Sequence, residues 1–217
     1  MIEMNVIPTS PKINENVAYL IGVLNSDGYL GLFLDKKRNL KIYRLKIDVA
    51  GKSLPMIKKF EVIFNETFER NVHVYDNQRW NRYEFGTSIN RLRSFFKPLE
   101  NGGIYPIMRF NPKLFGAYLA GIIDGDGHVQ KKNNKDRKIP QMRIEICGPN
   151  PLLEIKEGIE HLTRSKVNFI KNKGENSYDT YFYVTGRNRY FLENFVIPHL
   201  ALDYKKENLQ KYLDLIK

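Results

Sequence analysis

Apolar and polar residues alternate along the chain with two periods, and together they predict the same order of elements twice. An apolar segment with helical spacing follows Asn14, a second follows Asn111, and each ends in Asp-Gly. Asparagine is a favoured N-cap, and Pro112 suits the first helical position. Strict alternation after each helix predicts strands. The apolar faces of these strands carry Leu30, Leu32 and Leu34, then Leu45, Ile47 and Val49, and in the second half Met142, Ile144 and Ile146.

Each half then continues with an amphipathic helix, two more strands and a short closing helix. We expect the amphipathic helices over residues 54–68 and 152–162. The further strands are expected over residues 71–75 and 82–87, and again over 167–171 and 180–185. Residues 98–112 hold three prolines and two glycines, which favours a linker. The chain thus divides into halves at 1–97 and 113–217, joined by a linker at 98–112.

The two halves also share sequence. AYLIGVLNSDG begins at Ala18 and AYLAGIIDGDG begins at Ala117, 99 residues later. The strand YRLKIDVAG, from Tyr43, resembles QMRIEICG, from Gln141, with an offset of 97. A difference of two residues between the offsets fits a loop of variable length. The pattern therefore indicates an internal repeat of about 100 residues.

Small residues recur every fourth position on both copies of the first helix, so they lie on one helix face. They are Ala18, Gly22 and Ser26 in one copy, and Ala117, Gly121 and Gly125 in the other. A mid-helix glycine costs about 1 kcal/mol relative to alanine. Small residues allow two helices to approach closely. We expect the two helices to pack together about a pseudo-twofold axis, the alternative being that each packs on its own sheet.

The composition indicates the chemistry of the partner. The 217 residues carry a net charge of +11 and have a pI near 9.6, which favours a polyanion such as nucleic acid over a merely soluble basic surface. The single cysteine, Cys147, cannot form an internal disulfide, and four histidines make a zinc cluster improbable. No apolar run reaches membrane-spanning length, and the N-terminus has no signal-peptide pattern. The expected location is intracellular, in a prokaryotic cytoplasm or an organelle.

Paired carboxylates are the candidate chemistry. If the two helices are parallel, Asp27 and Asp126 meet at their C-termini, where the helix dipoles already place negative charge. A hard divalent cation such as Mg²⁺ would relieve this repulsion, and carboxylate-held cations serve phosphodiester hydrolysis. An EF-hand does not fit, because the stretch from Asp124 lacks the required spacing and closing glutamate. Two simple Asp-Gly turns are the alternative interpretation.

The repeated motif resembles the signature of the LAGLIDADG homing endonucleases. LAGIIDGDG, from Leu119, is close to it, and LIGVLNSDG, from Leu20, is looser but keeps the glycine and the final Asp-Gly. Two motifs about 100 residues apart resemble the single-chain, pseudosymmetric members. This resemblance implies an α+β, tandem α-β-β-α-β-β-α fold with two saddle-shaped antiparallel sheets.

The resemblance also implies roles for particular residues. Asp27 and Asp126 would bind Mg²⁺, or Mn²⁺ in its place, together with the carbonyls of Ser26 and Gly125. Asp124 would support the helix pair, and Lys205 is the candidate catalytic lysine. The first half offers no convincing equivalent of this lysine; Arg187, Lys46 and Arg143 are possible substitutes. Glycines stand at the positions where the family often has a glutamine, namely Gly51 and Gly148.

The outward strand faces and two hairpin turns would contact DNA in the major groove. Arginine and lysine suit guanine, glutamine suits adenine, and carboxylates accept from cytosine. The alternative is a solvated face that binds nothing. The candidate DNA-binding residues are Tyr29, Lys37, Arg44, Lys46, Asp48, Arg79 and Arg82 in the first half, and His128, Gln130, Lys132, Gln141, Arg143, Glu145, Lys171 and Lys173 in the second.

The expected function is a site-specific endonuclease that makes a metal-dependent double-strand break in a long DNA target, acting as a monomer. The resemblance implies short 3′ overhangs. The alternatives of the same fold are an RNA splicing maturase, which would bind intron RNA, and a DNA-binding regulator that does not cleave. Retention of both Asp27 and Asp126 argues against loss of catalysis.

Overall fold

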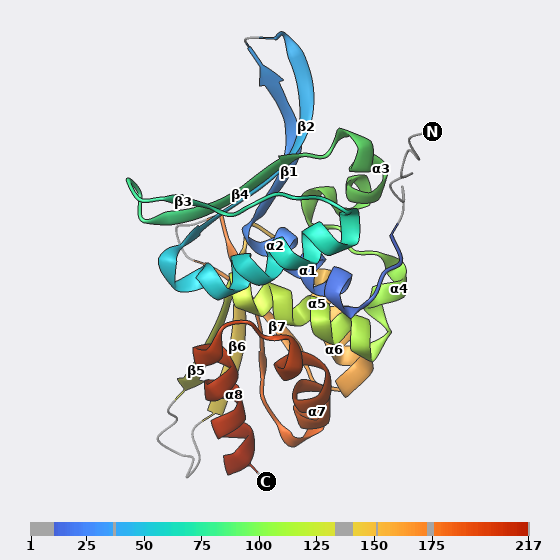
Figure 1. Ribbon diagram of the computed structural model, residues 1–217. Helices are drawn as coiled ribbons and strands as arrows, with labels where there is room; N and C mark the ends of the chain where they lie inside the picture. Colours follow the sequence, from blue (N-terminus) through green and yellow to red (C-terminus); the bar gives the residue numbers. More distant parts are fainter. Residues whose placement is uncertain (1–10, 37, 133–140, 151, 173–175, 217) are drawn as a thin grey trace.

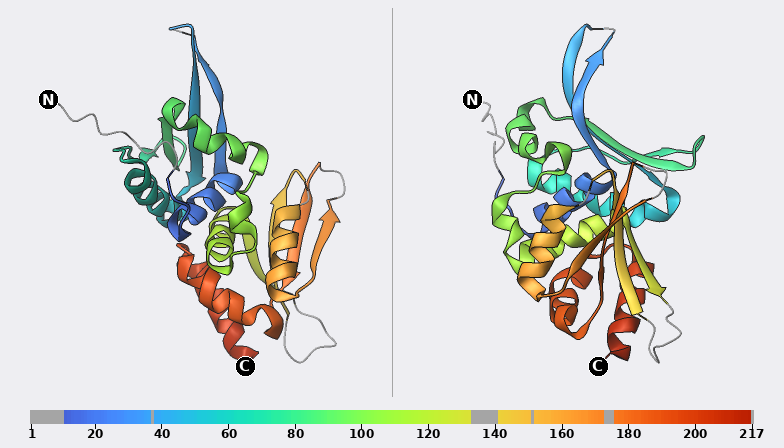
Figure 2. Two further views of the ribbon diagram at one scale, coloured as in Figure 1. Left: turned by 90° about the vertical axis from the view of Figure 1, so that its right-hand side faces the viewer. Right: turned by 180° about the vertical axis from the view of Figure 1, so that it is seen from behind.

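The computed structural model describes residues 11–36, 38–132, 141–150, 152–172 and 176–216. Two antiparallel four-stranded sheets lie on either side of a central pair of helices (Figure 1). Figure 2 shows the same helix pair from two further sides, with one sheet belonging to each half of the chain. Of the predicted DNA-binding residues, Lys37 and Lys173 lie outside the described residues.

The first half follows the predicted order, and its sheet has the strand order β1-β2-β4-β3. The helix α1 is capped by the Asn14 side chain, which accepts from Val17 N at 2.9 Å. The elements are α1 (Glu15–Asp27), β1 (Gly28–Asp35), β2 (Leu40–Ala50), η1 (Gly51–Ser53), α2 (Leu54–Phe68), β3 (Tyr75–Asn77), β4 (Arg82–Ser88), η2 (Asn90–Leu92), α3 (Arg93–Phe96), η3 (Lys97–Gly102) and α4 (Pro106–Arg109).

The second half repeats this arrangement, with the strand order β5-β6-β8-β7. Asn111 caps α5 as predicted, with Pro112 in the first turn. The elements are α5 (Pro112–Gly125), β5 (Gly127–Lys132), β6 (Gln141–Gly148), α6 (Leu153–Thr163), β7 (Val167–Lys171), β8 (Tyr178–Tyr183), α7 (Gly186–Phe191), the π-helical turn η4 (Leu192–Val196), η5 (Ile197–His199) and α8 (Asp203–Leu215). The tandem α+β fold class expected from the sequence is confirmed.

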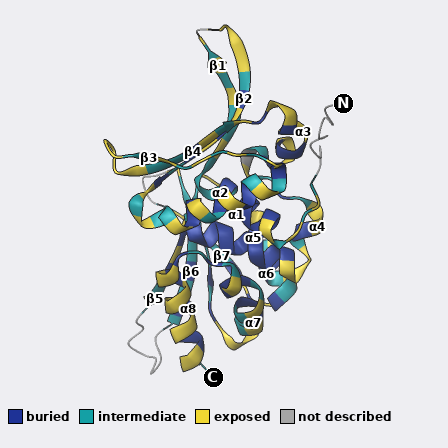
Figure 3. Ribbon diagram, in the orientation of Figure 1, coloured by how far each residue is buried: buried dark blue, intermediate teal, exposed yellow. Residues whose placement is uncertain are grey.

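The helices α1 and α5 form the centre of the core, where most of their residues are buried (Figure 3). A Cβ added to Gly22 would lie 2.1 Å from Tyr118 O, and one added to Gly121 would lie 2.3 Å from Tyr19 O. The two contacts are related by the 99-residue offset, so the pair has local twofold symmetry. Ala18 and Ala117 are fully buried on the same helices. The expected close pairing of these helices is confirmed.

The strand expected over residues 71–75 is wrong, because only Tyr75–Asn77 forms β3. Side chains of α2 take up the backbone groups that a strand ladder would use. The Asn65 amide bonds both the N–H and the carbonyl of Val72, and the Glu61 carboxylate accepts from Val74 N. Local side-chain bonds of this kind compete with sheet pairing.

The hairpin β1–β2 projects beyond the helices that cover its sheet (Figure 1). Leu30 packs against the core, but Leu32 and Leu34 are 52% and 55% exposed. The alternating pattern therefore identified the strand correctly, whereas its apolar face is covered only at the base.

The predicted linker at residues 98–112 is folded onto the core. It contains most of η3 and all of α4, and Leu99, Ile104 and Met108 are buried. In the described part of the chain, no helix is both long and apolar enough to cross a bilayer.

Candidate active site at the ends of the paired helices

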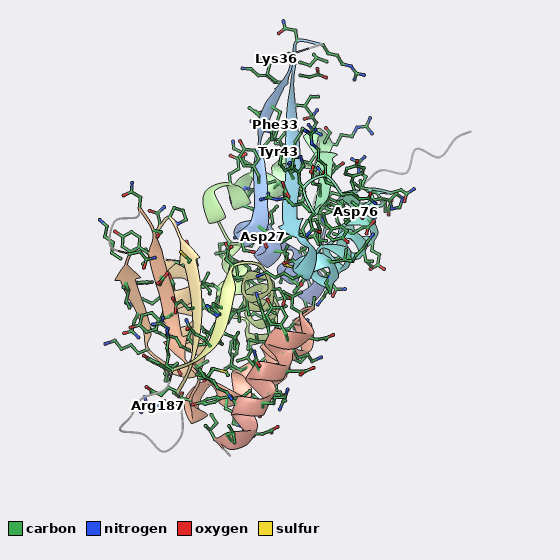
Figure 4. All side chains as sticks on the ribbon, turned by 90° about the vertical axis from the view of Figure 1, so that its left-hand side faces the viewer. Asp27, Phe33, Lys36, Tyr43, Asp76 and Arg187 are labelled. Atoms are coloured by element: carbon green, nitrogen blue, oxygen red, sulfur yellow. The ribbon has the colours of Figure 1, made fainter. Side chains whose placement is uncertain are left out.

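Asp27 and Asp126 stand at the adjacent C-terminal ends of α1 and α5. Asp27 is the last residue of α1, and Asp126 is the C-cap of α5. The ends are in contact, since a Cβ added to Gly125 would lie 2.1 Å from Ser26 Oγ and 2.8 Å from Asp27 Oδ2. Glycine at position 125 therefore leaves room for the neighbouring helix end and its carboxylate. Figure 4 places Asp27 between the two sheets.

The two carboxylates repel each other. Burial raises the pKa of Asp27, and the nearby Lys205 partly opposes this shift. Burial and then the charge of Asp27 raise the pKa of Asp126 to about 6, again with Lys205 acting in the opposite direction. Like charges held close together favour the protonated form. The site is therefore arranged to gain free energy from a bound cation.

Lys205 lies against the last turn of α5. Its Nζ donates to the carbonyls of Ile123 at 2.5 Å and Asp124 at 2.9 Å, and lies 3.5 Å from Gly125 O. The side chain is buried, which lowers its pKa to about 8, while the carboxylates of Asp124 and Asp27 oppose that shift. A cation is favoured at a helix C-terminus. Lys205 thus neutralises the helix end that carries Asp126.

A second lysine was missed by sequence reasoning. Lys52, in η1 just after β2, is exposed and close enough to lower the pKa of Lys205 further. The relevant signal was its place directly after Gly51, one of the two matched glycines. In the second half, the residue after Gly148 is Pro149, which carries no charge.

Lys52 and Lys205 lie close enough to each other for their charges to interact. Gly103 binds Asn25 as Ala201 and Leu202 bind Asp124, so the position that matches Lys205 is Pro106 or Ile107, and neither carries a charge. A cavity of about 120 Å³ adjoins Asp126 and is lined by Asn25, Gly148 and Pro149 among others. The two halves therefore surround the aspartates with different chemistry.

The first acidic position of the motif supports the helix pair. Asp124 is almost fully buried and accepts from Tyr19 Oη at 2.7 Å, from Ala201 N at 2.7 Å and from Leu202 N at 3.2 Å. Burial raises the pKa of Asp124, and these hydrogen bonds oppose the shift. The carboxylate is therefore occupied with protein donors.

Asn25 is the matching residue of the first half. It makes the pseudo-twofold-related hydrogen bonds, but it donates where Asp124 accepts. Asn25 Nδ2 donates to Gly103 O at 2.9 Å and to Tyr118 Oη at 3.3 Å. Tyr118 and Tyr19 are 99 residues apart, as are Asn25 and Asp124. An amide suits a carbonyl, and a carboxylate suits two N–H groups.

Several predicted DNA-binding residues pair with one another on the open faces of the sheets. Lys46 lies 3.7 Å from Asp48 and 3.5 Å from Glu84, and Arg82 lies 3.4 Å from Asp48. These groups are half-buried or exposed, so each pair contributes little stability. These ion pairs keep the charged side chains on the face of the first sheet that no helix covers.

A matching cluster lies on the second sheet. Arg143 forms an ion pair with Glu145, and Gln130 Nε2 donates to Glu145 at 2.8 Å. The guanidinium of Arg143 also lies 4.6 Å from the centre of the Tyr181 ring. Tyr181 belongs to this face and was not predicted.

The remaining predicted contact residues are placed on the same faces or on their hairpins. They are the exposed Tyr29, Arg44, Arg79, His128 and Lys171, and the half-buried Gln141 and Lys132. Arg187, considered as a substitute for the missing lysine, lies at the far end of the second sheet from Asp27 (Figure 4). It is therefore too distant to assist at the aspartates.

The donors at the helix ends suit a hard divalent cation. Two carboxylates converge there, and carbonyls of a last helical turn, such as those of Ser26 and Gly125, have no partner within the helix. Among the described residues, no cluster of three or more His, Cys, Asp or Glu side chains could hold a metal by itself. Any cation bound there would need oxygen ligands from the backbone, water or a substrate phosphate.

The fold is that of the LAGLIDADG homing endonucleases. No protein-family model and no curated protein matches the sequence. Among solved structures, I-DmoI in complex with DNA and Ca has a TM-score of 0.64 at 18% identity, covering 91% of this chain and 97% of that one. The LAGLIDADG homing endonuclease I-LtrWI, bound to target DNA, has a TM-score of 0.59 at 15% identity over 94% and 91%. The meganuclease I-SmaMI, bound to DNA, has a TM-score of 0.57 at 12% identity over 96% and 90%.

Proposed function

We propose that the chain is a site-specific homing endonuclease that makes a double-strand break in a long duplex DNA target. The observation that carries this proposal is the pair of mutually repelling aspartates at two contacting helix ends. The fold supports it, because the structural neighbours I-DmoI and I-LtrWI were solved on DNA. The net charge of +11 suits the same substrate.

Asp27 and Asp126, with the carbonyls of Ser26 and Gly125, would hold Mg²⁺, or Mn²⁺ in its place. When bound, the cation activates water for attack and stabilises the charge that develops on the scissile phosphate. Neighbour structures carry Mn, Ca or Mg, and Mg²⁺ is our choice as the abundant hard cation.

The protein's own groups prepare the site. We propose Lys205 as the catalytic-site lysine that balances the charge of the helix end, and Lys52 as a second cation that faces the substrate. The open sheet faces position the duplex across the aspartates. The halves, residues 1–97 and 113–217, would each address one side of the target, so that a monomer suffices.

The alternatives lack a supporting observation. A DNA-binding regulator without cleavage would not need two charged groups held against each other at a cost in stability. Nothing on the described residues favours intron RNA as a partner over duplex DNA.

Incubation with a library of random-sequence duplexes in Mg²⁺, followed by capture of newly formed ends, tests the proposal. The expected result is enrichment of one long target with short 3′ overhangs, which is lost for Asp126→Asn and in EDTA. Binding of one duplex without cleavage in Mg²⁺ or Mn²⁺ would instead identify a regulator.

A further inference from the structure

An open cavity of about 640 Å³ lies at the far end of the second sheet and has no role in the proposed chemistry. It is lined by Ser165, Lys166, Asn168, Tyr183, Thr185, Gly186 and Arg187. These residues come from the turn before β7, from β7 and β8, and from the start of α7. Figure 4 shows Arg187 at this end of the sheet, well away from Asp27.

The cavity opens on the same face as the proposed DNA-binding residues. Residues directly opposite each other in an antiparallel pair point to the same face. Tyr183 is opposite Arg143, and Asn168 is opposite Tyr181. The cavity therefore continues the face that carries Arg143 and Tyr181.

The lining is suited to an anion with an attached apolar part. Lys166 and Arg187 are exposed, and neither forms an ion pair with a described residue. The Ser165 hydroxyl is buried and has no hydrogen-bond partner among the described residues. The lining residues include no carboxylate, and the Tyr183 ring supplies an apolar wall.

Unpaired cations distinguish this cavity from the clusters nearer the aspartates. There, Lys46, Arg82 and Arg143 each lie beside a carboxylate. Two cations and an aromatic wall match the phosphate and the deoxyribose of a nucleic-acid backbone.

The position fits the duplex of the proposed function. Gly127, next to Asp126, is joined through Ile146 and Thr180 to Phe169 in one row across four strands. Such a row spans about 14 Å, and the three residues from Thr180 to Tyr183 add about 10 Å at right angles. On this grid Lys166 is roughly 17 Å from Gly127, so the cavity lies outside the catalytic centre but on the same sheet.

We propose that this cavity binds the sugar–phosphate backbone of the target DNA outside the cut site, on the side bound by the C-terminal half. Lys166 and Arg187 bind the phosphate, and the sugar packs on Tyr183. The inference rests on the proposed function, and it adds an anchoring site outside the catalytic centre.

Salt dependence of binding tests the anchor without knowledge of the target. The affinity for a random-sequence duplex is measured in EDTA at several salt concentrations, for wild type, Lys166→Met and Arg187→Met. Each lost phosphate contact should reduce the slope of log K against log salt by about 0.9. Lys113→Met is the matched control, because this exposed lysine lies in the first turn of α5, at the opposite end from Asp126.

A second pair of variants adds charge in place of removing it. A Cβ added to Gly186 meets no atom within 4 Å, so a side chain is tolerated there. Gly186→Glu should weaken binding more than Gly186→Gln, which has the same size but no charge. Equal effects of the two variants, or an unchanged slope in Arg187→Met, would overturn the anchor.

Two further outcomes separate the possible sources of failure. If inorganic phosphate binds wild type but not Arg187→Met while the DNA slope is unchanged, the cavity holds a free anion and the DNA assignment is wrong. If wild type does not bind duplex at all, the proposed function fails first. On a recovered target, ethylation of one phosphate outside the cut, on the side of the C-terminal half, should weaken binding by wild type but not by Arg187→Met.

Discussion

At the scale of single residues, matched positions in the two halves differ in ways that the structure explains. The first motif has Asn25 where the second has Asp124, and each residue meets backbone of the matching polarity. Neither is free to act as a metal ligand without breaking these bonds. Asp27 and Asp126 are the matched acids whose pKa values are raised by their setting at the helix ends.

Asp126→Asn is expected to abolish cleavage and to leave DNA affinity almost unchanged, because the sheet faces remain intact. In the absence of a divalent cation, the variant should unfold at the same or a slightly higher temperature at pH 7, since one repelling charge is removed. Thermal unfolding with and without Mg²⁺ measures this. A cation-induced rise in Tm as large as in wild type would contradict the metal-binding role.

Cation binding should depend on pH in the range where Asp126 titrates. Its pKa is raised from 3.8 to about 6, so the group's contribution to metal-free stability is fully present below pH 4 and is lost as pH rises through 6. Cation binding requires the deprotonated form. The apparent affinity should fall toward tenfold per pH unit below 6 and level off above 7, as measured by calorimetry; a flat profile from pH 5 to 8 would contradict it.

At the scale of the elements, the glycine contact between α1 and α5 sets the geometry of the site. Gly121→Ala would improve the intrinsic helix propensity by about 1 kcal/mol, yet its Cβ would lie 2.3 Å from Tyr19 O. Overpacking of this kind costs about 1–3 kcal/mol or more. We therefore expect a lower urea midpoint and reduced cleavage.

Gly186→Ala is the matched control for this prediction, because its added Cβ meets no atom within 4 Å. Equal urea midpoints for the two alanine variants would show that the helices can separate without cost.

Most elements were predictable because local signals agreed with the tertiary fold. Asn14 and Asn111 marked both helix starts, and the period of two marked β2 and β6. The prediction of a strand over residues 71–75 was wrong because side chains of α2 bind the backbone of this segment. The alternation of apolar and polar residues carries no information about such bonds. The exposure of Leu32 and Leu34 could not be predicted, since alternation does not show how far a hairpin extends beyond its helices.

At the scale of the whole molecule, the pseudo-twofold axis relates unequal halves. The motif spacing predicted that the two aspartates would meet, but not that Lys205 and Lys52 would lie close to each other. The positions of both lysines are set by turns, one after β2 and one before α8, and the course of these turns is known only from the folded chain. At the matched positions of the other half, Pro149 corresponds to Lys52 and Pro106 or Ile107 corresponds to Lys205, and none of these is charged.

The two DNA strands should therefore be cut at different rates. With a supercoiled plasmid that carries the target, we expect nicked circles to accumulate before linear product. Lys52→Met should slow one strand at least tenfold more than the other, because a cation beside developing phosphate charge stabilises the transition state. Equal slowing of both strands would contradict this assignment, and Lys113→Met serves as the control.

The reciprocal glycine contact has one more consequence. Because α1 and α5 meet backbone to backbone at Gly22 and Gly121, we expect Asp27 and Asp126 to keep one separation, whatever DNA lies across them. The helix pair would then fix the distance between the two cut positions, and so the length of the overhang. Changes in the segment 98–112 that joins the halves should alter the yield of product, while every end that forms keeps the same overhang length.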